Sequence, residues 1–492
     1  MNSATKNNDK FVFLLYNKNM IKFTGKIIQL GFGAVGKSFF ELIPKEIRFD
    51  KTKYFVITKN DEEFEYYKEL GGVENNFIHR ELNKENFESF LGKYLAEGDL
   101  LVDFAESVGT NDLVGLCAGK NCMYINTGSG EWASDGWPNV FTHENRLRKI
   151  IEDIKSKPNL NKYPIVLQHG NNPGLVSHFV KAGINFIVKK QTKGKQKKLL
   201  KELLKQNKFN EAAYHLRIRT IHINDIDMQE IDIEFDKDKL YNTWSTDALF
   251  FEMLSEAAFC LGADEVLYNQ DEIKFYDKES GHVELNKLAL ETICRTYYPG
   301  GFYDGHIVPH DEIISLSRFL EFRDGEILSR PSVRFVYLPC VLAADYLLES
   351  KVEDKGAYED RVIVRGYKYP KDYEIVYDEI IDGTEFVGAL LAGENFKPIW
   401  VGNRVFPKFI TKKFTNKFMY WQTPTITPVA ASALAATCWA IKNKARGGVY
   451  LPEDIPNYKF ILKFVEKYIS KTIYFQRIGN MIRSTIDHSS YK

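Results

Sequence analysis

The stretch that most constrains the fold is Lys26–Gly36, which reads Lys-Ile-Ile-Gln-Leu-Gly-Phe-Gly-Ala-Val-Gly. The apolar run Ile27–Leu30 predicts a buried strand and the residues after Gly36 favour a helix, so the G-x-G-x-x-G spacing lies where a dinucleotide fingerprint belongs. In such a loop the three glycines permit a tight turn, a close approach to pyrophosphate and close helix packing, and the helix N-terminus attracts phosphate. The predicted cofactor-binding residues of this loop are Gly31, Phe32, Gly33, Ala34, Val35 and Gly36.

The second predicted strand, Tyr54–Thr58, ends without a carboxylate. A dinucleotide site that prefers NAD has an Asp or Glu there, about 20 residues beyond the loop, to bind the ribose. Here Thr58 is followed by Lys59 and Asn60. We therefore assign Thr58 to the cofactor site, and the residues alone leave NAD and NADP both open because Lys59 could face a 2′-phosphate.

Charge and cysteine usage narrow the class of protein. The 492 residues carry 66 Lys plus Arg and 66 Asp plus Glu, and this zero net charge argues against a general nucleic-acid or membrane-surface binder. No apolar run approaches the roughly 18 residues of a membrane span, and Phe11–Tyr16 is too short for a signal-peptide core. The six cysteines lack zinc-ligand spacing, so we expect no metal site and a cytoplasmic protein.

Strands alternate with helices in the first third of the chain, which predicts an α/β fold with a parallel sheet. We expect an extension over 1–24, a Rossmann domain over 25–165, a mixed α+β catalytic and dimerisation domain over 166–410, and a helical segment over 411–492 that packs back on both. Substrate is expected at the carboxyl ends of the Rossmann strands.

The middle section is predicted from shorter patterns. They predict a strand over Arg217–Ile223, a helix over Asp247–Cys260 with Ser245 as its N-cap, and a strand over Ile375–Ile381. Asp382-Gly383 is a hairpin signal, and a strand should follow over Glu385–Leu391.

Polar residues in apolar settings make up a candidate site in this middle section. Asp225 ends a predicted strand, Trp244 leads into an apolar helix that carries Glu252, Glu385 begins a strand, and His310 lies in Val-Pro-His-Asp. Each residue taken singly could be structural, as an ion-pair partner or a core side chain. Together an indole and several carboxylates beside a dinucleotide domain predict a site for an organic cation.

Several ordered motifs resemble the bacterial-type homospermidine synthases of the saccharopine-dehydrogenase-like group. The motifs are Leu30–Gly36, His169–His178, Ile221-His222-Ile223, Asn242–Ser245, Arg330–Val333, Asp382-Gly383, Gly388 with Leu390 and Leu391, and Trp439-Ala440. The resemblance covers most of the chain. It implies a homodimeric enzyme that uses NAD to join two putrescine molecules with release of ammonia, the NAD being regenerated within the cycle.

The resemblance also implies roles for individual residues. Trp244 would contact a substrate ammonium by a cation–π interaction, with Glu252 beside it. Asn172 would hydrogen-bond substrate, and His310 would order the site.

This sequence departs from the family pattern at four places. Asp225 stands where the family has a glutamate, Glu385 where it has an aspartate, and Gly109 where it can carry an aspartate. Glu131 belongs to Gly-Glu-Trp rather than Glu-Pro-Trp, which displaces this candidate catalytic residue by one position. These changes leave the identity of the diamine substrate open, and cadaverine or spermidine could take the place of putrescine.

Two other functions are compatible with the residues. An NAD(P)-dependent amino-acid or opine-type dehydrogenase would need a Lys or Arg pair for the substrate carboxylate, whereas the candidate residues are acidic. A non-catalytic homologue that only binds NAD is the second alternative.

Overall fold

The structure is a computed structural model that describes residues 20–136, 139–157, 162–267, 269–352, 362–413 and 421–476, the side chains of 411–413 excepted. Most of the predicted extension, with its hydrophobic patch Phe11–Tyr16, lies outside these residues. Two compact units are present. Unit 1 comprises the described residues up to Gly136 with Arg148–Leu167 and Ala430–Tyr450, and unit 2 comprises the rest.

Unit 1 contains a seven-stranded sheet whose neighbouring strands all pair in parallel, in the order β24-β8-β7-β6-β2-β4-β5. Its strands are β2 (Ile27–Leu30), β4 (Tyr54–Thr58), β5 (Phe77–His79), β6 (Leu100–Asp103), β7 (Met123–Asn126), β8 (Ile165–Val166) and β24 (Val449–Tyr450). Its helices include α2 (Ala34–Glu46), α3 (Phe64–Glu69), α4 (Phe87–Leu91) and α5 (Thr110–Lys120). The predicted Rossmann-type α/β fold is confirmed. The short strand β1 (Ile21–Lys22) pairs with β3 (Ile47–Arg48) outside this sheet.

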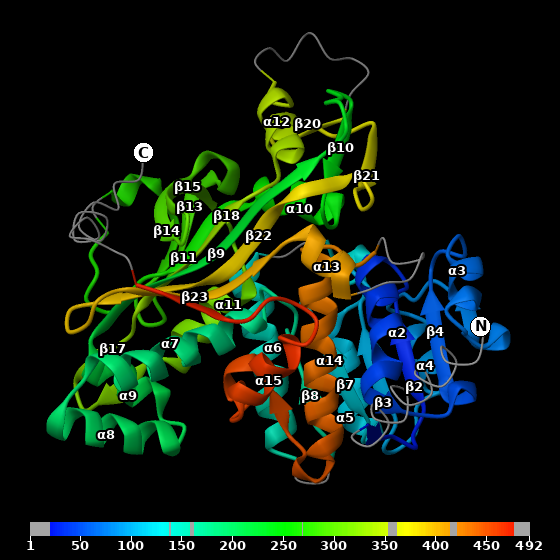
Figure 1. Cartoon of the computed structure of the whole chain (residues 1–492), viewed down its shortest axis with the longest axis horizontal. Helices are drawn as coiled ribbons and strands as arrows, with labels where there is room; N and C mark the ends of the chain where they lie inside the picture. Colours follow the sequence, from blue (N-terminus) through cyan, green and yellow to red (C-terminus); the bar gives the residue numbers. More distant parts are fainter. Residues whose placement is uncertain are drawn as a thin grey trace, which may run out of the picture. The chain divides into compact units, whose positions relative to one another are not determined.

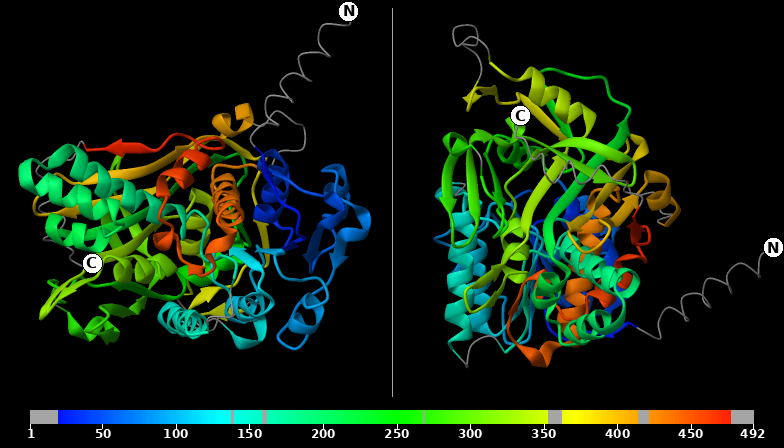
Figure 2. Two further views of the ribbon diagram at one scale, coloured as in Figure 1. Left: turned by 90° about the horizontal axis from the view of Figure 1, so that it is seen from below. Right: turned by 90° about the vertical axis from the view of Figure 1, so that its left-hand side faces the viewer.

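Unit 2 is built on a ten-stranded mixed sheet with the main order β12-β13-β11-β18-β9-β22-β23-β25. Two of its strands are long, β9 (Ile218–Ile231) and β22 (Ile380–Gly393), and they pair in antiparallel orientation along most of their length (Figure 1 and Figure 2). On its other side β9 pairs in parallel with β18 (Ser332–Leu338). The remaining strands of the sheet are β11 (Glu256–Cys260), β12 (Ile273–Asp277), β13 (His282–Leu288), β14 (Ile293–Tyr298), β15 (Gly301–Ile307), β23 (Ile399–Val405) and β25 (Ile473–Phe475).

Both faces of the sheet around β9 are covered. On one face, helix α7 (Leu175–Gln191) approaches so closely at Gly183 that an added Cβ would lie 3.0 Å from the Leu391 side chain. Helix α11 (Asp311–Phe319) packs on the neighbouring β18. On the other face, a core cluster forms from Ile226, Tyr297, Tyr298, Phe386, Leu390 and Trp400. The polar side chains of the middle of β9, which are Asn224, Asp225, Asp227 and Gln229, are therefore buried.

The mixed middle section differs from three predictions. The predicted helix over Asp247–Cys260 ends at Met253, as α10 (Thr246–Met253), and residues 256–260 form β11 because pairing with β13 outweighs their local helix preference. The predicted cap is confirmed, since the Ser245 hydroxyl accepts a hydrogen bond from the Ala248 N–H.

The other two corrections concern the approach to β22. Residues Ile375–Ile381 are not one strand, because β21 (Asp372–Ile375) ends where the prediction began and β22 starts at Ile380. Asp382-Gly383 is not a hairpin turn but part of β22, at a shift of register opposite Glu230 and Gln229. Gly383 has φ +83°, so the Asp-Gly pair supports a bulge instead of a reversal.

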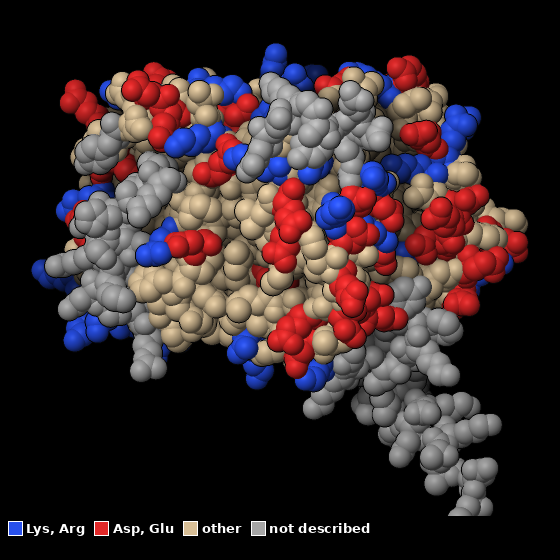
Figure 3. Space-filling view, turned by 90° about the horizontal axis from the view of Figure 1, so that it is seen from above, with Lys and Arg blue, Asp and Glu red and all other residues tan. Residues whose placement is uncertain are grey.

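No helix of the described residues is long and apolar enough to cross a membrane. On the face drawn in Figure 3, Lys and Arg side chains are dispersed among Asp and Glu side chains. This mixture agrees with the zero net charge of the sequence.

Candidate active site

The glycine loop of unit 1 has the geometry that a dinucleotide requires. Gly31 has φ +80°, and a Cβ on Gly36 would lie 2.5 Å from the Gly31 carbonyl oxygen, so the first and third glycines serve the turn and the close helix packing. A Cβ on Gly33 would meet no atom within 4 Å. Gly33 is the N-cap of α2 and no side chain caps this end, which fits a pyrophosphate as the partner of the helix N–H groups.

Phe32 of this loop has a different place. Its side chain is buried and makes edge contacts with the rings of Phe40, Tyr67 and Phe77. Phe32 therefore anchors the loop, and only its backbone is placed to contribute to a cofactor site. Thr58 ends β4 half-buried, as predicted, and its role toward a ribose stays a prediction.

Three buried carboxylates share one face of the sheet in unit 2. Asp225 and Asp227 are two residues apart on β9, so their side chains point to the same side. Glu385 on β22 is the register partner of Asp227. The three residues are 8%, 3% and 2% exposed, respectively. We call this row of Asp225, Asp227 and Glu385 the acidic face.

Asp225 is oriented by a turn that is distant in sequence. The Asn172 Nδ2, in the turn before α7, donates a 2.8 Å hydrogen bond to Asp225 Oδ2, whereas Oδ1 has no partner among the described residues. Burial raises the pKa of Asp225 to about 7, opposed by the Asn172 hydrogen bond and assisted by the Asp227 carboxylate. Asp225 is thus suited to exchange a proton near neutral pH.

Glu385 is even less solvated. Burial, together with the Asp225 and Asp227 carboxylates, raises the pKa of Glu385 well above its usual range, against a hydrogen bond with Thr425. Its Oε2 has no hydrogen-bond partner among the described residues. Burial also raises the pKa of Asp227, but hydrogen bonds from Thr243 and Gln229 counter it.

Trp244 is held beside the acidic face by a tyrosine. Its Nε1 donates a 3.0 Å hydrogen bond to the Tyr337 hydroxyl, and the two rings meet at 70° with centroids 6.4 Å apart. Tyr337 on β18 is the register partner of Asp225. An indole fixed by its N–H and only half-buried is free to present a ring face to an ammonium group.

His310 and Glu252 lie around the same site. The His310 Nδ1 pairs with the Glu312 carboxylate, and the imidazole packs on Phe335, 4.4 Å between ring centroids. Burial lowers the pKa of His310, but the Glu312 charge, with Glu252 and Asp311, outweighs burial and raises it to about 9. The charge of His310 also acts on Asp225. The structure therefore brings together six of the seven predicted catalytic residues, which are Asn172, Asp225, Trp244, Glu252, His310 and Glu385.

The seventh predicted residue, Glu131, lies in unit 1 after β7. Its neighbour Trp132 is buried and donates a 2.6 Å hydrogen bond from Nε1 to Asp112. A Cβ on Gly109 would lie 2.4 Å from that nitrogen. The glycine at 109, which departs from the family pattern, thus makes room for Trp132.

Within the described part of the chain, the acidic face has no lysine or arginine as an ion-pair partner. Among the described residues, no Lys or Arg forms an ion pair with Asp225, Asp227 or Glu385, and the nearby cation is the His310 imidazolium. Buried carboxylates need a cation or protons. The arrangement can bind an ammonium group and take protons from it.

Asp227, Glu312 and Tyr337 are site residues that the sequence analysis missed. Asp227 was hidden because the strand was predicted to stop at Ile223, whereas β9 continues to Ile231. Alternation continued over Ile223, Asp225 and Asp227 would have placed both carboxylates on one face.

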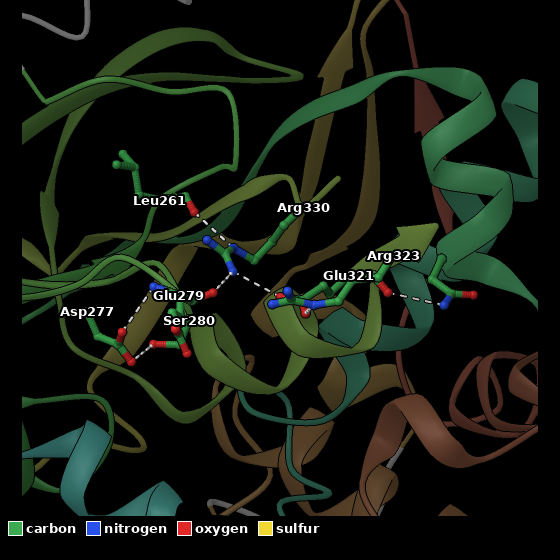
Figure 4. Close-up of polar contacts among 8 residues, drawn as sticks. Leu261, Asp277, Glu279, Ser280, Glu321, Arg323 and Arg330 are labelled. Atoms are coloured by element: carbon green, nitrogen blue, oxygen red, sulfur yellow. Dashed lines mark hydrogen bonds and ion pairs between the residues drawn. The ribbon is translucent and has the colours of Figure 1, made fainter. Parts of the chain in front are cut away.

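Arg330, the first residue of the motif Arg330–Val333, has a structural role. Arg330 is buried and donates to the carbonyl oxygens of Leu261 (3.2 Å) and Glu279 (2.7 Å) and to Glu321 (2.9 Å), as Figure 4 shows. It thereby holds the turn between β12 and β13, where Gly281 has φ +73°. None of these three contacts is with the acidic face.

Comparisons with known proteins agree with the geometry. The model of the family "Saccharopine dehydrogenase NADP binding domain" matches residues 27–152. The homospermidine synthase of Mesorhizobium japonicum is 25% identical over 91% of this chain and 89% of its own length, and that of Blastochloris viridis is 26% identical over 86% and 85%.

Solved structures agree on the fold. The homospermidine synthase of Legionella pneumophila, solved in complex with NAD, has a TM-score of 0.79 at 23% identity and covers 94% of this chain and 93% of its own. Saccharopine dehydrogenase (L-Glu forming) from Saccharomyces cerevisiae has a TM-score of 0.52 at 11% identity, over 92% and 100%. The predicted resemblance and fold class are confirmed.

Proposed function

Because this chain resembles homospermidine synthases over 91% of its length and has the fold of the Legionella enzyme, we propose that it is itself a homospermidine synthase. In this proposal two putrescine molecules give homospermidine and ammonia. The glycine loop, with Gly31, Gly33 and Gly36, would hold NAD, which would supply a reversible acceptor for the hydride of an amine-bearing carbon.

The observation that carries the proposal is the acidic face, which has no Lys or Arg ion-pair partner among the described residues and only the His310 imidazolium nearby. A substrate carboxylate, as an amino-acid or opine-type dehydrogenase requires, would be repelled there. A diamine brings two ammonium groups that can replace the missing cations, and Trp244 offers a ring face beside them.

The chain's own residues supply the proton transfers. An ammonium must lose a proton before its carbon can release a hydride. Asp225, with a pKa of about 7, can accept that proton, while Asn172 fixes the carboxylate. In this proposal the seven candidate residues, Glu131 included, act on the substrate, and the substrate is putrescine. The protein acts as a homodimer in the cytoplasm. The six cysteines, all free, fit a reducing compartment.

Isotope labelling tests the reaction. The purified protein is incubated with NAD and putrescine deuterated on its amine-bearing carbons, and the products are identified by mass spectrometry. We expect homospermidine with deuterium returned to carbon, and no steady rise of reduced-nicotinamide absorbance.

The alternatives predict different products. Stoichiometric NADH with a free aldehyde would identify an amine dehydrogenase, and binding without turnover would identify a non-catalytic homologue. A panel of cadaverine and spermidine run in parallel identifies the amine that the altered carboxylates prefer.

A further inference from the structure

Asp227 lies at the centre of the acidic face, although the candidate roles above do not include it. It follows Asp225 by two residues on β9 and lies directly opposite Glu385 on β22. The position of Asp227 alone does not show whether its carboxyl group is ionised or protonated. The hydrogen bonds around it do.

Both oxygens of Asp227 accept hydrogen bonds. Oδ1 receives the Gln229 backbone N–H at 3.0 Å and the Gln229 Nε2 at 2.9 Å, and Oδ2 receives the Thr243 hydroxyl at 2.6 Å. A carboxyl group that accepts three hydrogen bonds is favoured as the anion. Asp225 and Glu385 differ, because each has one oxygen without a partner among the described residues.

The same hydrogen bonds connect Asp227 to two parts of the site. Thr243 immediately precedes Trp244, so its bond to Asp227 fixes the backbone from which the indole projects. Gln229 Nε2 also donates to Thr425 Oγ1 at 2.8 Å, and Thr425 is the hydrogen-bond partner of Glu385. A continuous chain thus joins Asp227 to Glu385.

We propose that Asp227 is a positioning residue of the amine site, which holds the Thr243–Trp244 corner on β9 and supplies a fixed negative charge beside Glu385. This inference rests on the proposed function in one respect, that the ligand is an ammonium. Burial and this fixed charge together favour the protonated forms of Glu385 and Asp225 in the absence of ligand, and an arriving ammonium favours their ionised forms.

Other charged and titratable groups also face this row. Glu385 faces Asp225 and Asp227. From the other packed elements, the groups that act on Asp225 or Asp227, or are acted on by them, are His310 and Glu312 at the start of α11, Tyr303 on β15, Tyr337 on β18 and Cys340 before α12 (Val341–Glu349). Among the three carboxylates of the acidic face, Asp227 is the one with both oxygens hydrogen-bonded, to Thr243 beside Trp244 and to Gln229, which Thr425 links to Glu385.

The test compares four variants by calorimetric titration with putrescine across pH. In Asp227→Asn, loss of the fixed charge lowers the pKa of its carboxyl neighbours, so the acid limb of the affinity profile moves to lower pH by about one unit. Thr243→Val keeps the charge but releases the Trp244 corner, so affinity falls roughly tenfold at every pH with the limb in place. Thr243→Ser restores the hydroxyl and the affinity.

The fourth variant is a matched control. Glu284→Gln neutralises another buried carboxylate of the same sheet, which is paired with Asn139 and Lys274 away from the acidic face. Neither the affinity of this variant for putrescine nor the acid limb of its affinity profile should change. Melting temperatures show which variants fold; if Asp227→Asn does not, the contrast between Thr243→Val and Thr243→Ser decides.

The inference is overturned if Asp227→Asn and wild-type protein give superimposable limbs, or if Thr243→Val binds putrescine as wild type does. Its failure is distinct from that of the proposed function. If wild-type protein binds putrescine but makes no homospermidine, the proposed function is wrong, and the comparison of Asp227→Asn with wild type can still be made. Wild-type protein that binds no diamine overturns both.

Discussion

Asn172 reaches across 53 positions of sequence to donate a 2.8 Å hydrogen bond to Asp225, and the two residues join the turn before α7 to strand β9. This bond favours the ionised carboxylate, in opposition to burial. Asn172→Ala should therefore raise the pKa of Asp225 and move the acid limb of product formation to higher pH. A loss of a hydrogen bond to a charged group predicts a roughly tenfold fall in kcat/KM. An unchanged limb would mean that Asn172 only shapes the turn.

Trp244 offers the second prediction. Trp244→Ala should weaken putrescine binding roughly thirtyfold, because a cation–π contact with a desolvated ammonium is worth about 2 kcal/mol. Trp244→Phe is the matched control: it keeps a ring but loses the hydrogen bond to Tyr337, so it should retain part of the affinity. NAD affinity, measured by fluorescence, should stay constant in both. Equal diamine affinity in all three proteins would identify Trp244 as a packing residue.

The third prediction separates catalysis from folding at two carboxylates. Asp225→Asn and Glu252→Gln each deprive a substrate ammonium of its counter-charge, so activity should fall far more than melting temperature. The measurement is kcat/KM beside the thermal midpoint for each variant. Large losses of melting temperature with proportionate activity loss would indicate structural ion pairs instead.

The fourth prediction concerns pH. The pKa of Asp225 is raised from 3.8 to about 7, so the folded protein binds this proton more tightly than the unfolded chain does. The stability contributed by this proton is present below the unfolded pKa and is lost as pH rises through about 7. Asp225→Asn cannot ionise, so its melting temperature relative to wild type should increase between about pH 4 and about pH 7.

By the same reasoning, the contribution of His310 to the stability of the protein is lost in a higher pH range. Its pKa is raised to about 9 by Glu312 against burial, so its contribution is complete below about 6.5 and disappears as pH rises through 9. Putrescine supplies cations to the ionised carboxylates, so its stabilising effect should grow as pH rises from about 5 to about 8 in wild type and less so in Asp225→Asn. A pH-independent thermal shift would contradict both assignments.

The sequence was most informative where local chemistry determines the structure. Gly31, Gly33 and Gly36 could be interpreted residue by residue, because the turn, the open approach and the close packing each require a missing Cβ. The candidate residues Asp225, Trp244 and Glu385 were found from polar residues in apolar surroundings. That Asp225 and Glu385 share one face of the sheet depends on the register between β9 and β22, which no local pattern specifies.

Errors arose where pairing partners decide the structure. Residues 256–260 favour a helix locally but form β11 because β13 is available as a partner, and Asp382-Gly383 forms a bulge because β22 continues through it. Asp227 was missed because the strand was predicted to end at Ile223, whereas β9 continues to Ile231 in pairing with β22. These are tertiary effects, and each changed the interpretation of residues close to the acidic face.

The last prediction concerns Gly109, where the family can carry an aspartate. An added Cβ would lie 2.4 Å from Trp132 Nε1, which donates to Asp112 at 2.6 Å. Gly109→Asp should displace the indole and destabilise unit 1 by about 1–3 kcal/mol, as overpacking of a buried site does. Gly115→Asp is a control on the same helix, since a Cβ there meets no atom within 4 Å.

The double mutant tests the cause. If Trp132 is the obstacle, Gly109→Asp should cost much less stability in a Trp132→Ala background, so the two losses measured by denaturant unfolding would be strongly non-additive. Additive losses would mean that the new side chain is accommodated without moving the indole. Gly109 would then be compatible with the family's aspartate, and the glycine would not be explained by the position of Trp132.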